Sequence, residues 1–226
     1  MDPLAGSPWS TPATVAGFVR SPPNDVLLGV ALQEFDRTGG GHLLDIGCGA
    51  GRNAVPLARL GWNVLGTDLS WPMLLAAADR VAEVGGTGRL RLALASMDNL
   101  PVATRSIDFV VAHGIWNLAP STATFRRAVA EAARVARPGA VLFVFTFSRH
   151  TLPPEATPVP GERFVFTQFS GQPQCFLAES ELVDELLTAG FDREPGVPIR
   201  EYNRPQPGAL VRGAPVIYEG IFRRRS

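Results

Sequence analysis

The chain has 226 residues, of which 46% are hydrophobic and 19% charged, a composition typical of a globular soluble protein. Its 21 basic residues balance its 21 acidic residues, and this even charge argues against a nucleic acid as the main partner. All the basic residues are arginine, which excludes Schiff-base catalysis by lysine and a phosphate-binding loop that depends on lysine.

Neither a membrane span nor a secretion signal is expected. The richest apolar run, residues 140–147, has the length of a buried strand, whereas a membrane span needs about 18 apolar residues. The first residues contain an acid and prolines instead of a basic start followed by an apolar stretch. The two cysteines, Cys48 and Cys175, are too few for a disulfide scaffold and lack a metal-site spacing. We therefore expect a cytoplasmic protein with no metal.

Helices and strands alternate along most of the chain, after a proline-rich arm over residues 1–23. Capping residues and glycines predict helices at 24–37, 51–61, 71–84 and 121–136. Short apolar or alternating runs predict strands at 42–46, 62–68, 89–95, 106–113 and 140–147. Strict alternation of this kind indicates parallel strands with right-handed crossovers, in a sheet covered by helices on both faces.

The last third of the chain has a different pattern. Residues 148–177 are rich in proline and aromatic residues and are expected to be an irregular insertion, followed by a helix at 178–191. Two strands are expected at 197–203 and 214–222, and the absence of a helical pattern between them suggests an antiparallel hairpin at the end of the sheet. We expect a single domain over residues 1–226.

Three alternate glycines, Gly47, Gly49 and Gly51, fall in the first turn from strand to helix, in the stretch LLDIGCGAGRN. In an open parallel sheet this turn is the usual place for a ligand, because bare backbone allows close approach and the helix N-terminus favours an anion. The third glycine comes one residue too early for the dinucleotide fingerprint G-x-G-x-x-G.

Polar residues also follow the second and third predicted strands. Asp68 ends the second strand, where a carboxylate can accept hydrogen bonds from ribose hydroxyls. Ser96, Met97 and Asp98 follow the third, where an acid can accept a hydrogen bond from an exocyclic amine. The three strand ends together predict a site for a nucleoside. Asp68 could instead cap the next helix, and Asp98 could form a turn.

Five motifs occur in order over about residues 40–147: DIGCGAGRN, GTDLS, ASMDNLP, IDFVVAH and RVARPGAVL. In this order and spacing the chain resembles the class I S-adenosylmethionine-dependent methyltransferases. The resemblance implies an α/β, doubly wound fold with a mostly parallel seven-stranded sheet whose last strand is antiparallel. It also implies S-adenosylmethionine as cofactor and S-adenosylhomocysteine as product.

The resemblance assigns roles to individual residues. Asp45 would face the cofactor's ammonium group, Asp68 its ribose and Leu69 its adenine, while Arg20 could reach its carboxylate or an acidic acceptor. The residues expected at the cofactor are Arg20, Asp45, Gly47, Cys48, Gly49, Gly51, Asn53, Asp68, Leu69, Met73, Ser96, Met97, Asp98 and His113. Cys48 is expected to fill space in the loop and not to act as a reactive thiol.

The acceptor is expected to be a small, partly apolar molecule methylated on oxygen, nitrogen or sulfur by in-line displacement. Its walls would come from Trp9, Phe18, Trp116, Asn117, Phe164 and Phe166, with the insertion over the acceptor side. Aromatic residues such as Phe164 and Phe166 are more often core packing than a substrate cage, and Trp116 could also be core. His113 is the candidate general base by location, and a structural imidazole is the alternative.

Two other functions fit the same residues. One is a protein that binds S-adenosylmethionine or S-adenosylhomocysteine without turnover. The other is a nicotinamide-dependent oxidoreductase, although the glycine spacing and the lack of lysine argue against it. We expect no nucleic-acid or membrane partner, and a monomer or a homodimer.

Overall fold

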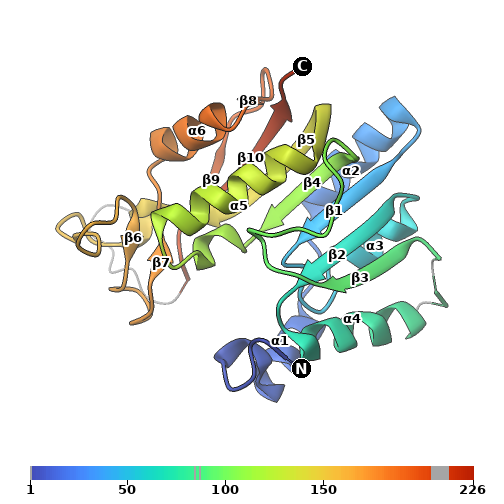
Figure 1. The fold of residues 1–226 in the computed structure, drawn as a ribbon, viewed down its shortest axis with the longest axis horizontal. Coiled ribbons are helices and arrows are strands. Elements are labelled where there is room, and N and C mark those ends of the chain that lie inside the picture. The colour runs from blue at the N-terminus through green and yellow to red at the C-terminus, as the bar shows by residue number, and fades with distance from the viewer. Residues whose placement is uncertain (1, 84, 87, 205–213) are drawn as a thin grey trace.

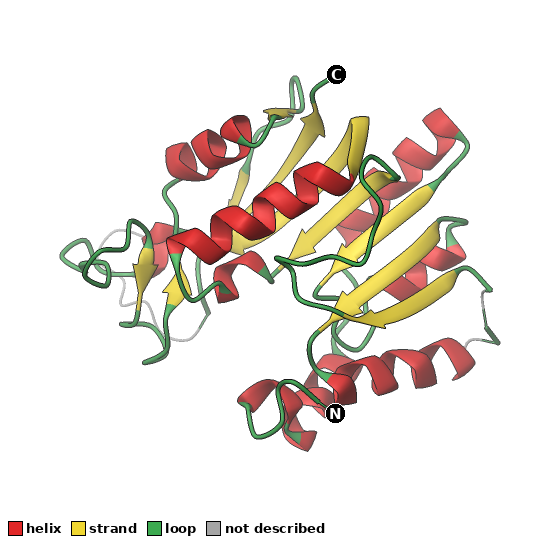
Figure 2. Cartoon of the chain, viewed as in Figure 1, coloured by secondary structure: helices red, strands yellow, loops and turns green. Residues whose placement is uncertain are grey.

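A single large sheet runs through the computed structural model, which describes residues 2–83, 85–86, 88–204 and 214–226 (Figures 1 and 2). In the described residues the sheet has eight strands in the order β3-β2-β1-β4-β5-β10-β8, with β9 beside β10. The strands are β1 (His42–Ile46), β2 (Asn63–Asp68), β3 (Leu90–Leu94), β4 (Ile107–His113), β5 (Ala136–Phe147), β8 (Phe191–Arg193), β9 (Arg200–Tyr202) and β10 (Ile217–Arg224).

The first five strands of the sheet are parallel, and β10 is antiparallel to each of its neighbours β5, β8 and β9. The doubly wound α/β fold with an antiparallel last strand is therefore confirmed, although the described sheet has eight strands where seven were expected, because the short β9 also pairs with β10. Because parallel strands all end at one edge, the residues that follow β1, β2, β3 and β4 meet there.

Helices cover both faces of the sheet (Figure 1). One face carries α2 (Asp25–Thr38), α3 (Ala54–Arg59) and α4 (Trp71–Glu83), and the other carries α5 (Thr122–Val135) and α6 (Glu179–Thr188). Successive residues of a strand point to opposite faces, so Leu43 and Val111 enter the core under α2 and α3, while Leu44 and Val110 enter the core under α5. Both faces are thus buried, as expected for a parallel sheet.

Some element boundaries differ from the predicted ones. The predicted helix at 51–61 begins only at Ala54, because residues 51–53 complete the turn of the glycine loop. The predicted helix at 178–191 is too long, since Phe191 leaves it to pair with Arg224 of β10. The strand predicted at 140–147 starts earlier, at Ala136, where β5 pairs with Ile107 across a register shift.

Short elements appear where an irregular chain was expected. The arm contains a 3-10 turn, η1 (Pro8–Ser10), and a helix, α1 (Pro12–Arg20), which begins where the Thr11 side chain accepts a hydrogen bond from the Thr14 N–H. The insertion contains η3 (Arg149–Thr151) and an antiparallel strand pair, β6 (Val165–Phe166) and β7 (Gln174–Cys175). One more 3-10 turn, η2 (Trp116–Leu118), follows β4.

The described residues can be searched for a membrane-spanning helix and for a metal site. Within the ranges given above, no helix combines the length and the apolar character that crossing a bilayer requires. Over the same ranges, no cluster of histidine, cysteine, aspartate or glutamate side chains is arranged to hold a metal ion. Part of the predicted hairpin turn, residues 205–213, and residue 84 of the predicted helix at 71–84 lie outside the described residues.

Candidate active site

A cavity of about 480 Å³ opens where β1, β2, β3 and β4 end. The glycine loop after β1 and the segments after the other three strands contribute to its wall, and the N-terminal arm closes one side. Many of the predicted cofactor residues line it: Gly47, Gly49, Asp68, Leu69, Met73, Ser96, Met97, Asp98 and His113. The structure thus brings together side chains from strand ends that are far apart in the sequence.

Position 47 in the glycine loop requires glycine, both for its backbone conformation and for its contact with a neighbouring side chain. Its φ is +70°, in the left-handed region that other residues rarely adopt. A Cβ atom there would also lie 2.6 Å from Cδ1 of Ile115, which lines the cavity. Any larger residue would therefore be strained and would push Ile115 aside. Bare backbone at this position leaves the end of β1 open to a ligand.

Asp45 lies beneath the glycine loop and is almost completely buried, with 1% of its surface exposed. Its Oδ2 atom has no hydrogen-bond partner among the described residues. Burial raises the pKa of Asp45 to about 7, against the opposing effect of the nearby Arg52 cation. An unpartnered buried carboxylate is costly. Like Gly51, Asp45 does not belong to the described wall of the cavity, although it directly precedes the loop that does.

Two other predicted loop residues support the loop from below. Cys48 is buried, and burial raises the pKa of its thiol well above the ordinary range, so this cysteine is not a reactive thiolate. Asn53 is also buried, and its Oδ1 atom accepts a hydrogen bond of 2.9 Å from the N–H of Asn24. Neither residue belongs to the described wall of the cavity.

Asp68 was considered both as a ribose ligand and as a cap of the next helix, and its position is compatible with both roles. One carboxylate oxygen accepts a hydrogen bond of 2.9 Å from the Gly49 N–H, and the other accepts one of 2.8 Å from the Ser70 N–H. It therefore holds the glycine loop and the start of α4 together while it lines the cavity. Burial raises the pKa of Asp68. A carboxylate can accept about four hydrogen bonds, which leaves capacity for ribose hydroxyls.

The carboxylate of Asp98 is held in place by two neighbouring side chains. Ser96 Oγ donates to Asp98 Oδ1 at 2.5 Å, and Arg127 Nη2 donates to Asp98 Oδ2 at 3.1 Å. The hydrogen bond from Ser96, followed by Arg127, lowers the pKa of Asp98. All three side chains line the cavity together with Met97. The end of β3 thus presents an ionised, oriented carboxylate and an apolar side chain.

His113 ends β4 and lines the cavity, with its ring stacked on Phe145 at a centroid distance of 4.1 Å. Its Nε2 atom lies 3.1 Å from Asn24 Nδ2 and its Nδ1 atom 3.1 Å from Arg52 Nη2. Burial, then the Arg52 charge, lowers the pKa of His113 to about 3. The imidazole is therefore neutral at physiological pH, and both of its nitrogens face donors.

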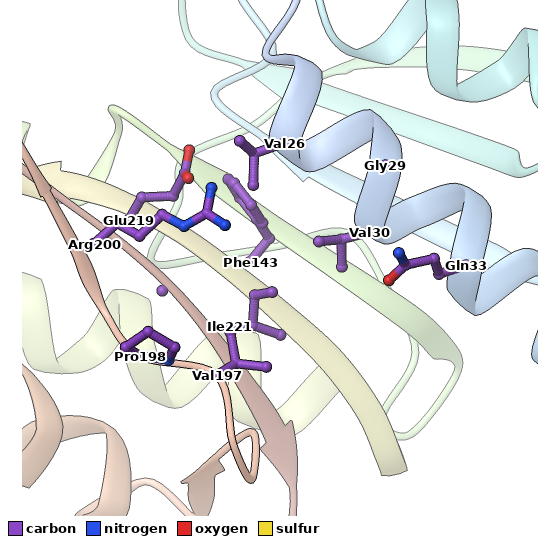
Figure 3. A pocket seen from close by; sticks show the side chains of 11 residues that line it. Val26, Gly29, Val30, Gln33, Phe143, Val197, Pro198, Arg200, Glu219 and Ile221 are labelled. Atoms are coloured by element: carbon purple, nitrogen blue, oxygen red, sulfur yellow. The ribbon is translucent and has the colours of Figure 1, made fainter.

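A second cavity, of about 330 Å³, lies between α2 and β10, and Figure 3 shows the side chains that line it. Val26 and Val30 of α2 face Phe143 and Ile221 across it, and Glu219 lies beside Arg200. Glu219 accepts hydrogen bonds from Tyr202 OH at 2.7 Å and from Asn24 Nδ2 at 2.9 Å. Asn24 is thus bound to His113 in one cavity and to Glu219 in the other.

The structure places the predicted acceptor residues in two groups. Trp9 and Phe18 of the arm line the cavity and pack edge to face at 6.2 Å. The others are buried in the core or beneath the insertion and do not belong to the described wall: Trp116, Asn117, Phe164 and Phe166. Trp116 and Phe164 pack edge to face on Phe125 of α5, and Phe166 packs on Phe176. The alternative interpretation of these aromatic residues as core accounts for their positions.

Arg20 lies at the end of α1, where it is exposed and outside the described wall of the cavity. Two residues that were not predicted to belong to the site contact His113 on its wall. Arg52, directly after Gly51, contacts His113, and Asn24 connects His113, Asn53 and Glu219. The sequence offered a signal for each, since Arg52 belongs to the glycine motif and Asn24 caps α2. Their contacts span up to 195 positions and could not be read from spacing.

Comparisons with known proteins indicate a methyltransferase domain in this chain. Residues 44–144 match a family model described as a methyltransferase domain. The ubiquinone/menaquinone biosynthesis C-methyltransferase UbiE of Syntrophotalea carbinolica is 36% identical over 128 residues, which cover 54% of this chain and 51% of that protein. Ribosomal RNA small subunit methyltransferase C of Alcanivorax borkumensis is 34% identical over 106 residues, 46% of this chain and 31% of that protein. The chain thus matches about half or less of the length of these relatives.

Solved structures share the fold. The 1,6-didemethyltoxoflavin-N1-methyltransferase of Burkholderia thailandensis, solved with 1,6-didemethyltoxoflavin and S-adenosylhomocysteine bound, has a TM-score of 0.63 and 18% identity. The superposition covers 90% of this chain and 80% of that one. Residues 44–144 thus match a methyltransferase domain, and the chain is similar in fold to solved S-adenosylmethionine-dependent methyltransferases.

Proposed function

We propose that this protein transfers a methyl group from S-adenosylmethionine to a small, partly apolar molecule by in-line displacement. The observation that carries the proposal is the cavity at the ends of β1 to β4, with the unpartnered buried Oδ2 of Asp45 beneath its glycine loop. The cofactor supplies a methyl group already activated on a sulfonium. The protein then has to hold both reactants in line and exclude water.

The described residues fit the three parts of this cofactor. Asp45 suits the ammonium group, the free acceptor positions of Asp68 suit the ribose, and Leu69, Met97 and Asp98 suit the adenine. Gly47 and Gly49 leave room for the chain that joins these parts. We place the cofactor here for these reasons.

The apolar side of the cavity supports a small, partly apolar acceptor. Apolar surface comes from Trp9, Phe18, Ile115 and Leu118. The charged side chains on the described wall are Asp68, Asp98 and Arg127, and the last two form an ion pair. The insertion packs next to this wall, since Cys175 of β7 contacts the Ala119 carbonyl. We infer that residues 148–177 cover the acceptor side.

We infer that His113 positions its neighbours and does not act as a general base. Its lowered pKa makes it a weak proton acceptor, and its two ring nitrogens already face Asn24 and Arg52. An acceptor that binds with a lone pair free needs no base, because alignment alone brings the reacting atoms together.

The acceptor is not carried over from the relatives, whose names include a quinone C-methyltransferase, an RNA methyltransferase and a toxoflavin N1-methyltransferase. The neutral overall charge and the apolar wall favour a small molecule over RNA. We further infer a single-domain protein that works in the cytoplasm as a monomer or a homodimer, which light scattering would test.

The test is to incubate the protein with methyl-labelled S-adenosylmethionine and fractionated metabolite extracts. Label should enter a small organic molecule, and S-adenosylhomocysteine should form in equal amount. Label found only in protein or RNA would contradict the proposed acceptor class. Tight binding without any transfer would favour the non-catalytic alternative, and calorimetric binding of NADH in place of S-adenosylhomocysteine would favour the oxidoreductase.

A further inference from the structure

The second cavity, between α2 and β10, lies outside the site proposed for methyl transfer and carries two opposite charges. Glu219 on its wall is buried, with 4% of its surface exposed, whereas Arg200 on the same wall is exposed. The two residues are directly opposite each other on the antiparallel strands β10 and β9. Their side chains therefore leave the sheet on the same face, with Cβ atoms about 5 Å apart. A carboxylate and a guanidinium thus lie side by side at this cavity (Figure 3).

These two charged groups do not form an ion pair with each other. Neither residue belongs to an ion pair among the described residues. Glu219 accepts hydrogen bonds from two neutral donors, the Tyr202 hydroxyl and the Asn24 amide. Hydrogen bonding to the same Tyr202 hydroxyl, and to a smaller extent the charge of Glu219, raises the pKa of Arg200. A carboxylate can accept about four hydrogen bonds and a guanidinium can donate five, so both groups have positions left for a ligand.

The opposite side of the cavity is apolar and is widened by a glycine in the middle of a helix. Val26 and Val30 of α2 face Phe143 and Ile221. Gly29 also lines the cavity, and a Cβ atom there would meet no heavy atom of the described residues within 4 Å. Glycine destabilises a helix interior relative to alanine, and no close neighbour requires it at this position. The glycine therefore enlarges the cavity at a cost to the helix.

We propose that this cavity binds a free α-amino acid with an apolar side chain. The ammonium group of the amino acid bonds Glu219, its carboxylate bonds Arg200, and its side chain lies against the valines of α2. The two charges of an amino acid are held close together on one carbon, like the two charges that face them. The volume of about 330 Å³ is near the lower end of the range for ligand pockets, about 300–1,000 Å³, and suits a molecule of this size.

Ligands with a single charge fit this wall less well. An ammonium group alone at Glu219 would be repelled by Arg200, and a carboxylate alone at Arg200 would be repelled by Glu219. A residue of a peptide lacks at least one of the two charges, so the ligand is a free amino acid. The inference does not depend on the proposed methyl transfer, because the residues that carry it line the second cavity.

Calorimetry on the full chain tests the proposal with L-leucine and L-phenylalanine. Their amides, leucinamide and phenylalaninamide, lack the carboxylate. Their deaminated acids, isocaproate and hydrocinnamate, lack the ammonium group. At least one of the two amino acids should bind the wild type, and its amide and its deaminated acid should each bind at least about tenfold more weakly, because each loses a charge-assisted hydrogen bond.

Four variants locate the site. Arg200→Gln should make the amino acid and its amide bind alike, and Glu219→Gln should make the amino acid and its deaminated acid bind alike. Gly29→Leu should abolish binding because its side chain fills the cavity, and it should melt no lower than the wild type, since leucine favours a helix over glycine. Leu32→Ala is the control, at an exposed position of α2 outside the described wall, and should bind like the wild type.

Three results would overturn the proposal: a wild type that binds neither amino acid, binding that survives Gly29→Leu, or analogues that bind as tightly as the amino acid. Because Arg200 is exposed, Arg200→Gln leaves the core intact and decides the matter even where another variant unfolds. A loss of affinity in Arg200→Gln that is equal for the amino acid and its amide would also refute the assigned role of the guanidinium.

Discussion

Replacing Asp45 with asparagine should stabilise the free protein and weaken its hold on the cofactor. Burial raises the pKa of Asp45 from an ordinary 3.8 to about 7, so the folded chain binds a proton that the unfolded chain releases near pH 3.8. The folded state then holds more protons between these two values, and its stability falls as the pH rises through them. Above pH 7 the full penalty is present, about 4 kcal/mol at about 1.36 kcal/mol per pH unit.

Asparagine cannot ionise, so the Asp45→Asn variant lacks this pH dependence. Linkage gives a penalty for the wild type of about 2 kcal/mol at pH 5 and about 4 kcal/mol at pH 8. The stability difference between variant and wild type should therefore grow by about 2–3 kcal/mol over this range. In a chain of this length that corresponds to roughly 5–10 °C in melting temperature, measured by calorimetry without ligand.

The comparison between the two pH values is the informative part, because any cost of burying the amide is the same at both. A difference that does not change with pH would show that Asp45 does not titrate as a buried acid, and the reasoning would fail. Saturating S-adenosylhomocysteine supplies a further check. Its ammonium group should hold the wild-type carboxylate ionised, and the pH dependence of the wild type should flatten.

Four further outcomes are expected. Asp68→Ala should weaken S-adenosylhomocysteine binding by about tenfold or more, because the ribose and the Gly49 N–H both lose their acceptor; unchanged affinity by calorimetry would place the nucleoside elsewhere. His113, with its pKa of about 3, should show no change in its ring NMR signals between pH 5 and pH 8, whereas a transition near pH 6.5 would contradict its neutral, partly buried state. Gly47→Ala should cost about 1–3 kcal/mol in unfolding free energy, and adding Ile115→Ala should restore only the part due to the close contact, since the strain at a φ of +70° remains; full restoration would refute the strain. Phe164→Ala should lower stability by about 3–5 kcal/mol without changing the KM for an identified acceptor, and an altered KM at unchanged stability would return Phe164 to the acceptor wall.

The fold could be predicted because its signals are local. Alternating hydrophobic runs and helix caps such as Asn24 placed the elements, and the glycines of the first turn marked the end of the sheet where the cavity lies. Element boundaries were harder to predict where a helix and a strand compete for the same residues. Phe191 continues the apolar pattern of α6, and yet it pairs with β10. The strand that draws it out of the helix lies more than 20 residues later in the sequence, so the local pattern does not indicate it.

The site could be predicted only in part. Residues directly after the strands, such as Asp68 and Met97, are placed by topology, and they line the cavity. The aromatic residues of the insertion gave no such signal, and Phe164 packs into the core although it was expected at the acceptor. Arg52 and Asn24 act through side-chain contacts across the fold, which no local pattern encodes.

The position of Asn24 limits how the cavity can open. Its hydrogen bonds to His113 and Glu219 anchor the start of α2, whereas η1 and α1, which precede it, contain no buried residue. The hydroxyls of Ser10 and Ser70, 3.0 Å apart, are among the few polar links between this segment and α4. Opening the cavity on this side would therefore require η1 and α1 to separate from α4, while the contacts of Asn24 hold the start of α2.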